Sequence, residues 1–257
     1  MPRAHFLTSS LLERSGFRHA FFLRHHGWST GPYDSLNFSV DVGDQPAIVK
    51  KNLRLAALEL GVDSDRLCWV RQVHGNGVLV LEPGTRSEHA QRESADAVLC
   101  TDPTLACGVR TADCVPVLIA DRRSGVVGAV HAGWRGVVVG AVTAAVRRLR
   151  SLLGTPGDLV AAIGPHISQR AFEVSQDVAE QLGACAPAES VVHRANGRIT
   201  VDLAKIVHVQ LVNLGLGSSE IEHIGGCTVL EPERYFSYRR DGRLSGRHLS
   251  AIVPRGV

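Results

Sequence analysis

Short β-branched segments crowd the middle of this chain and limit the folds that it can adopt. Strands are expected at residues 77–81, 97–100, 105–110, 115–120 and 126–131. The last four follow one another without a helical pattern between them, and residues 121–125 are typical of a hairpin turn. A doubly wound sheet alternates strands with helices, so this order predicts an α+β fold, with a mixed β-sheet core flanked by helices.

Helical patterns lie on both sides of this region. Apolar residues recur on one face of residues 136–153, with arginines in the last turns and Gly154 as a cap. A second helix is expected at residues 202–214, where Asp202 suits the N-cap. Shorter patterns predict helices at residues 47–60 and 176–182 and a surface loop at residues 82–94.

Length and composition favour an ordinary globular enzyme. The 257 residues contain no linker-like run, so one domain spanning residues 1–257 is expected. The net charge of +3 gives no support for a nucleic acid or a membrane as a partner. Six scattered cysteines favour a reducing compartment, and we see neither a signal peptide nor an apolar run long enough to span a bilayer. A cytoplasmic location is therefore expected.

Three separate segments each carry a residue that can bind a metal. They are His74 in Gln-Val-His-Gly, Cys114 in Ala-Asp-Cys-Val-Pro and His131 in Val-His-Ala-Gly-Trp. Two histidines and one cysteine match a catalytic zinc site, which keeps its fourth position open. Each residue also has a plain structural interpretation, since free cysteines are usually buried and a histidine can simply satisfy a turn. Asp113 should point away from Cys114 in an extended chain and orient a neighbour.

Two polar runs allow either a solvated or a functional interpretation. Residues 24–37 contain adjacent histidines and Asn37, which could contact a substrate. Residues 235–247 hold four arginines in nine residues. Their spacing favours a solvated hairpin that turns at residues 241–242, while the alternative is a fork for phosphate or carboxylate.

Taken together, these segments resemble the YfiH-like family, also called the DUF152, laccase-domain or multicopper-polyphenol-oxidase-like family. The resemblance runs from Arg24 to Arg247. The matching strings are residues 32–37, 43–44, 72–75, 95–97, 111–116, 130–136, 163–165, 172–174, 227–228, 237–241 and 246–247.

The resemblance implies a zinc-dependent purine nucleoside enzyme. It implies phosphorolysis of adenosine, inosine, guanosine or methylthioadenosine, deamination of adenosine, and a fold related to a deamidating toxin with a Cys-His pair. The metal ligands and catalytic residues would be His74, Cys114 and His131. The expected contacts with nucleoside and phosphate are Asn37, Arg239 and Arg240. If the arginine run is a strand, alternation would turn only one of the two arginines toward the pocket.

Three alternatives stay open. Some family members look like editing factors for peptidoglycan precursors, which would make Cys114 a nucleophile with a histidine base. A copper oxidase would also use two histidines and a cysteine, but Met1 is the only methionine available as an axial ligand. The third alternative is a non-catalytic module that binds an anion.

The chain departs from the family pattern in two places. His26-Gly27-Trp28-Ser29 replaces the usual Gly-Gly-Val-Ser, so bulk is expected beside the pocket. His166 follows Gly164-Pro165, where small residues or cysteine are common, and it could support a neighbouring site residue.

Overall fold

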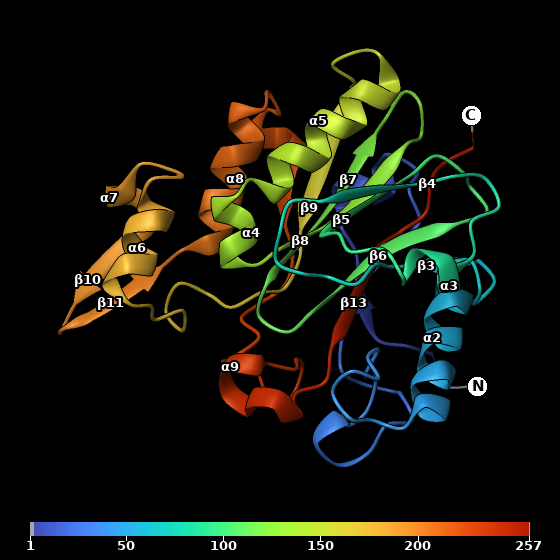
Figure 1. Cartoon of the computed structure of the whole chain (residues 1–257), viewed down its shortest axis with the longest axis horizontal. Helices are drawn as coiled ribbons and strands as arrows, with labels where there is room; N and C mark the ends of the chain where they lie inside the picture. The colour runs from blue at the N-terminus through green and yellow to red at the C-terminus, as the bar shows by residue number, and fades with distance from the viewer. Residues whose placement is uncertain (1–2, 257) are drawn as a thin grey trace.

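Two β-sheets packed against each other form the centre of the computed structural model, which describes residues 3–256 (Figure 1). One sheet has the strand order β1(Phe6–Leu7), β2(His19–Phe22), β13(His248–Ile252), β6(Ala106–Thr111), β3(Leu67–Cys68). The other has the order β12(Ile221–His223), β9(Leu159–Ile163), β7(Val115–Asp121), β8(Val127–Ala132), β5(Ala97–Cys100), β4(Val78–Leu81). A separate hairpin joins β10(Val192–Ala195) to β11(Arg198–Val201).

Both large sheets are mixed. In the six-stranded sheet, β4 pairs with β5 and β9 with β12 in parallel, while the other pairs are antiparallel. The hairpin expected around residues 121–125 is confirmed, because β7 and β8 pair with Val117 opposite Val130. The fold class is therefore α+β, as the succession of strands predicts.

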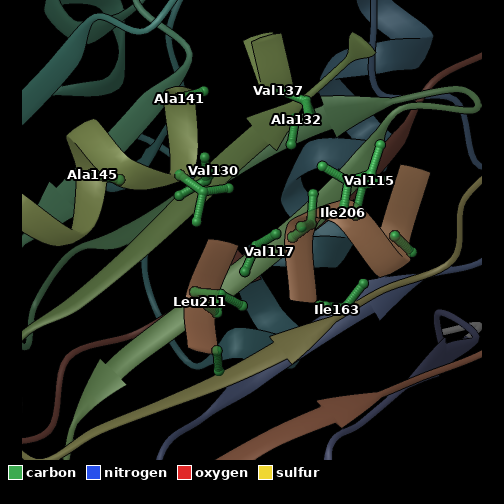
Figure 2. Packing of buried hydrophobic residues seen from close by; sticks show 14 of the residues in the cluster. Val115, Val117, Val130, Ala132, Val137, Ala141, Ala145, Ile163, Ile206 and Leu211 are labelled. Carbon is green, nitrogen blue, oxygen red and sulfur yellow. The ribbon is translucent and has the colours of Figure 1, made fainter. Parts of the chain in front are cut away.

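Helices cover the outer faces of the sheets. The helices are α1(Ser10–Arg14), α2(Pro46–Leu60), α3(Ser87–Ala90), α4(Trp134–Val138), α5(Ala141–Leu153), α6(Gln176–Gly183), α7(Ala188–Val191), α8(Leu203–Asn213) and α9(Tyr238–Asp241), with short 3-10 turns η1(Gly31–Tyr33), η2(Ser218–Glu220) and η3(Gly242–Leu244). Figure 2 shows α5 and α8 packed over the six-stranded sheet, where Val117 and Val130 meet Ala141 and Leu211. Full burial of such side chains contributes about 1.5–3 kcal/mol each.

Most of the expected helices are confirmed. Helix α8 begins after Asp202, whose carboxylate accepts a hydrogen bond from the backbone nitrogen of Lys205 at 2.9 Å. Helices α2 and α6 occupy the predicted positions. The single helix predicted at residues 136–153 is wrong, because the chain forms α4 and α5 with a break at Gly140. Gly140 has a φ of 81°, a left-handed conformation that glycine adopts without steric strain.

The arginine run near the C-terminus is helical, so the expected hairpin is wrong. Residues Tyr238–Asp241 form α9, and Gly242–Leu244 form η3. The Ser237 hydroxyl accepts a hydrogen bond from the backbone nitrogen of Arg240 at 3.2 Å and caps the first turn. The predicted loop at residues 82–94 also contains the short helix α3. None of the described helices has the length and apolar character needed to cross a bilayer.

Candidate metal centre and active site

His74, Cys114 and His131 come together at one end of the six-stranded sheet. His131 lies on β8, Cys114 immediately precedes β7, and His74 lies in the loop between β3 and β4. The antiparallel pairing of β7 with β8 places Pro116 opposite His131, and this brings Cys114 beside that histidine. One potential ligand atom from each of the three residues lies within 4.8 Å of the others.

The loop that carries His74 is attached to a buried carboxylate. Asp96 is fully buried just before β5 and accepts hydrogen bonds from three successive backbone nitrogens, those of Val73 at 3.3 Å, His74 at 2.9 Å and Gly75 at 2.6 Å. These contacts hold His74 at a φ of 58°, which is uncommon for a residue other than glycine. The unusual backbone at His74 is thus stabilised by Asp96.

The same carboxylate orients the second histidine. His131 Nδ1 lies 2.8 Å from Asp96 Oδ1 and donates its proton, because a carboxylate only accepts. His131 Nε2 is then left for a metal or a substrate. Burial opposes the charged form of His131, but the neighbouring Cys114 and Asp96 raise its pKa to about 9. Burial and the proximity of His131 lower the pKa of His74.

Asp113 lies outside the cluster of three potential ligands and holds the C-terminal segment. Its Oδ1 accepts a hydrogen bond from Thr228 Oγ1 at 2.6 Å, and its Oδ2 accepts one from the backbone nitrogen of Arg239 at 2.6 Å. Asp113 has a φ of 88°, so the chain turns sharply just before Cys114. Asp113 therefore positions Arg239 beside the site.

Close backbone packing makes room for the three side chains. A Cβ atom at Gly133 would lie 2.5 Å from His74 Nδ1 and 3.0 Å from Cys114 Sγ. Only glycine fits at this distance without displacing a potential ligand. Two imidazole nitrogens, one thiol sulfur and a carboxylate behind one imidazole form a donor set that fits a single divalent metal ion.

A cavity of about 660 Å³ opens beside this cluster. Its wall includes His74, Cys114 and His131, together with five arginines and three aromatic side chains. The arginines and aromatic residues are Arg71, Arg110, Arg135, Arg239, Arg247, Trp134, Phe172 and Tyr238. The cavity can thus offer positive charge and stacking surfaces to a ligand held near the cluster.

Asn37 does not line this cavity. It is fully buried, and its amide nitrogen donates to Ser39 O and to Asp44 Oδ2, both at 2.8 Å. Its amide oxygen accepts from the backbone nitrogens of Ser39 and Arg247. These contacts fully occupy the amide, so Asn37 holds two loops together where a substrate contact was expected.

The two neighbouring arginines point in different directions. Arg239 lines the cavity, donates to Glu173 O at 2.9 Å and lies over the Phe172 ring. Arg240 lies outside the cavity wall and donates to Thr228 O and Tyr235 O. The divergence follows from a helical turn, so the explanation based on strand alternation is wrong.

The residues that depart from the family pattern, His26, Trp28 and His166, all lie outside the cavity wall. His26 and Trp28 do not line the cavity; His26 stacks on His5 with ring centroids 4.1 Å apart, and Trp28 is partly exposed. The expected bulk beside the pocket is therefore absent. His166 also lies outside the wall, with Nδ1 2.8 Å from Gly164 O, and burial lowers its pKa.

Sequence reasoning missed several residues that organise the site. One sequence feature could have identified Asp96: it is a carboxylate at the start of an apolar strand, where a buried charge needs hydrogen-bond partners. Gly133 has only its place two residues after His131 as a signal, because its close approach to His74 and Cys114 depends on the fold. Arg247 belongs to the arginine run that the sequence marks, but Arg110 has no distinguishing pattern, because its placement beside Arg247 depends on the pairing of β6 with β13.

Comparison with known proteins extends this description. Residues 18–255 match the family model described as multi-copper polyphenol oxidoreductase laccase. A purine nucleoside phosphorylase of Streptomyces coelicolor is 40% identical over 235 residues, which cover 90% of this chain and 95% of that protein. The purine nucleoside phosphorylase YfiH of Shigella flexneri is 37% identical over 230 residues, covering 88% of this chain and 89% of that protein.

Solved structures share the fold. YlmD from Geobacillus stearothermophilus superimposes with a TM-score of 0.89 at 28% identity, covering 98% of this chain and 100% of that one. The YfiH protein of Bacillus licheniformis gives a TM-score of 0.90 at 26% identity, covering 99% and 97% of the two chains.

Proposed function

Because this chain belongs to the multi-copper polyphenol oxidoreductase laccase family, with purine nucleoside phosphorylases among its relatives, we propose that it is itself a purine nucleoside phosphorylase. The proposed substrates are adenosine, inosine, guanosine and methylthioadenosine, and adenosine is also deaminated. The observation that carries the proposal is the cluster of His74, Cys114 and His131 in the wall of an arginine-rich, aromatic cavity. We further propose that residues 1–257 act as one domain in the cytoplasm, where six free cysteines stay reduced.

The proposed resident metal is zinc, held by His74, Cys114 and His131. Zinc bound by three protein ligands offers an open position for water or substrate and acts as a Lewis acid. Copper is the second choice, because within residues 3–256 only this one cluster of potential ligands occurs and no second cluster could build a multi-copper centre. Asp96 supports zinc by fixing the ring of His131.

Phosphorolysis requires a bound phosphate and a base held in place, and the cavity residues can meet both demands. An oxygen of phosphate must bond to the anomeric carbon of ribose while that carbon's bond to the purine nitrogen breaks, and the departing base takes the electron pair and a proton. Guanidinium groups neutralise the phosphate. Trp134 and Phe172 supply flat surfaces for the base, and Arg239, expected as a contact for nucleoside or phosphate, is assigned here to the nucleoside.

The proposal is tested by the products of the purified, metal-analysed protein. Inosine or adenosine is incubated with and without phosphate, and free base is measured by chromatography. We expect release of hypoxanthine or adenine that depends on phosphate and is lost after the metal is chelated. Absence of base release by fully loaded protein across the four nucleosides would overturn the assignment.

A second candidate function is supported by the order of three side chains. In space, His131 lies between Cys114 and Asp96. Cysteine hydrolases arrange a nucleophile, a base and an orienting carboxylate in this order. Such an enzyme could edit the amino acid of a peptidoglycan precursor. A metal bound to Cys114 would block this chemistry, so alkylation of Cys114 in freshly purified protein would favour the hydrolase. Stoichiometric zinc with an unreactive Cys114 would favour the phosphorylase.

A further inference from the structure

Two of the five cavity arginines differ from the others in their burial. Arg110 and Arg247 are half-buried, whereas Arg71, Arg135 and Arg239 are exposed. The side chain of Arg110 is only 15% exposed. A guanidinium group that is withdrawn from water loses solvation and must be compensated by nearby acceptors.

Strand pairing brings these two arginines to one face of a sheet. Strands β6 and β13 are antiparallel, with Arg110 directly opposite Leu249. Arg247 lies two residues before Leu249, and side chains two apart along an extended chain share a face. Arg110 on β6 and Arg247, which immediately precedes β13, therefore both line the cavity whose wall also includes Cys114.

The carboxylates near Arg110 and Arg247 do not neutralise both guanidinium groups. Arg110 makes one ion pair, at 3.1 Å with Asp41, whose side chain is 70% exposed and hence well solvated. Within residues 3–256, Arg247 forms no ion pair and donates instead to the backbone oxygens of Ser245 at 2.7 Å and Gly246 at 3.0 Å. Asp113, the other carboxylate in the wall, already accepts two hydrogen bonds.

The electrostatics of the two groups agree with this geometry. Burial lowers the pKa of Arg110, Asp41 partly offsets the effect, and the charge of Arg247 lowers it further. Burial also lowers the pKa of Arg247, while Cys114 and Asp113 act in the opposite direction. The pair thus presents two charges of like sign beside the metal-binding cluster.

We propose that Arg110 and Arg247 form the subsite for inorganic phosphate, the co-substrate of phosphorolysis. The proposal rests on the proposed function and locates its second substrate on the side of the cavity formed by β6 and β13. Two guanidinium groups suit a phosphate dianion, because each can donate two parallel hydrogen bonds to its oxygens.

The test compares Arg247→Gln with Arg148→Gln in the full-length protein. Arg148 is exposed on α5 outside the cavity wall, so its variant has the same change of net charge. We expect Arg247→Gln to raise the KM for phosphate by about tenfold or more and to change the KM for inosine by about twofold at most. Inorganic phosphate alone should raise the melting temperature of wild type and Arg148→Gln, and have little effect on Arg247→Gln.

Arg247→Lys and Arg110→Gln extend the test. Lysine keeps the charge and loses the fork, so Arg247→Lys should bind phosphate with intermediate affinity and stays informative if the glutamine variant unfolds. Unchanged KM for phosphate in folded Arg247 and Arg110 variants would overturn the subsite and leave phosphorolysis intact. Phosphate binding that depends on Arg247, without turnover of any purine nucleoside, would instead support the anion site and overturn the proposed function.

Discussion

Asp96 and His131 form a buried carboxylate–imidazole pair with 2.8 Å between Oδ1 and Nδ1. The same carboxylate accepts the backbone N–H groups of the loop around His74. Asp96 therefore links two of the three potential metal ligands, although it lies outside the cluster itself. Carboxylates in this position fix the tautomer and the orientation of a ligating histidine.

Replacing Asp96 by Asn should weaken metal binding by about 10- to 100-fold, because the amide cannot accept from every donor that now faces the carboxylate. Competition with a chelator measures the affinity. Asp121→Asn is the matched control: Asp121 is also buried and accepts three hydrogen bonds, but outside the cavity wall. We expect it to lower stability and leave metal affinity unchanged. Equal metal affinity in both variants would contradict the role of Asp96.

Gly133→Ala should abolish metal binding in a folded protein. The added methyl carbon would lie 2.5 Å from His74 Nδ1, so a potential ligand must move. Gly75→Ala is the control, since its Cβ would meet Asp96 Oδ2 at an ordinary 3.5 Å. Elemental analysis measures the metal content of both variants, and circular dichroism shows whether they fold. Full metal content in Gly133→Ala would contradict the close packing of Gly133 against His74.

Zinc content should be about one ion per chain in wild type and fall to a trace in Cys114→Ala. Cys185→Ala provides the comparison, because Cys185 is the other cysteine with a partly exposed side chain and lies outside the cavity wall. Its zinc content should equal that of wild type. If Cys114→Ala retained full zinc, the proposed ligand set would have to be abandoned.

The neighbouring Arg239 and Arg240 should affect different properties. Arg240→Ala removes hydrogen bonds to three backbone oxygens and should cost about 2 kcal/mol, or about 4–8 °C in melting temperature. Arg239→Ala removes a guanidinium group from the cavity wall and should raise the KM for nucleoside, with a smaller change in melting. Calorimetry and steady-state kinetics on both variants separate the effects. The reverse pattern would reassign the two residues.

Stability should fall as the pH is lowered from about 6.5, partly because of His248. Burial lowers the pKa of His248 to about 3, and its ring accepts from Phe236 N while lying 3.0 Å from Phe22 O. The pKa of a histidine in the unfolded chain is about 6.5. Between pH 6.5 and pH 3 the unfolded chain therefore binds a proton at His248 that the folded chain does not. Each pH unit in this window therefore costs about 1.4 kcal/mol.

His248→Gln should flatten the dependence of stability on pH between 7 and 5. Denaturant titrations at several pH values measure the slope. His193→Gln, at an exposed position on β10, should keep the slope of wild type. An unaltered slope in a folded His248→Gln variant would assign the acid sensitivity to other groups.

Local patterns in the sequence predict the elements that depend on neighbouring residues. The run of strands, the turn at residues 121–125 and the cap at Asp202 follow from side-chain alternation and from short-range hydrogen bonding. The tail around Arg240 is harder to predict, because the Ser237 hydroxyl accepts from Arg240 N and the distant Asp113 carboxylate accepts from Arg239 N, and both contacts stabilise a helical turn. The spacing of residues within the tail does not predict the contact with Asp113, which lies 126 positions earlier in the chain.

Residue type in the sequence was enough to propose His74, Cys114 and His131 as a group, because few residues bind metals. Their approach within 4.8 Å, and the part played by Asp96, were decided by tertiary structure. The same holds for Arg110 and Arg247, which share a face only because β6 pairs with β13. Local sequence sets what each side chain can do; the pairing of distant strands decides which side chains meet, since burial and hydrogen bonding are satisfied over the whole fold.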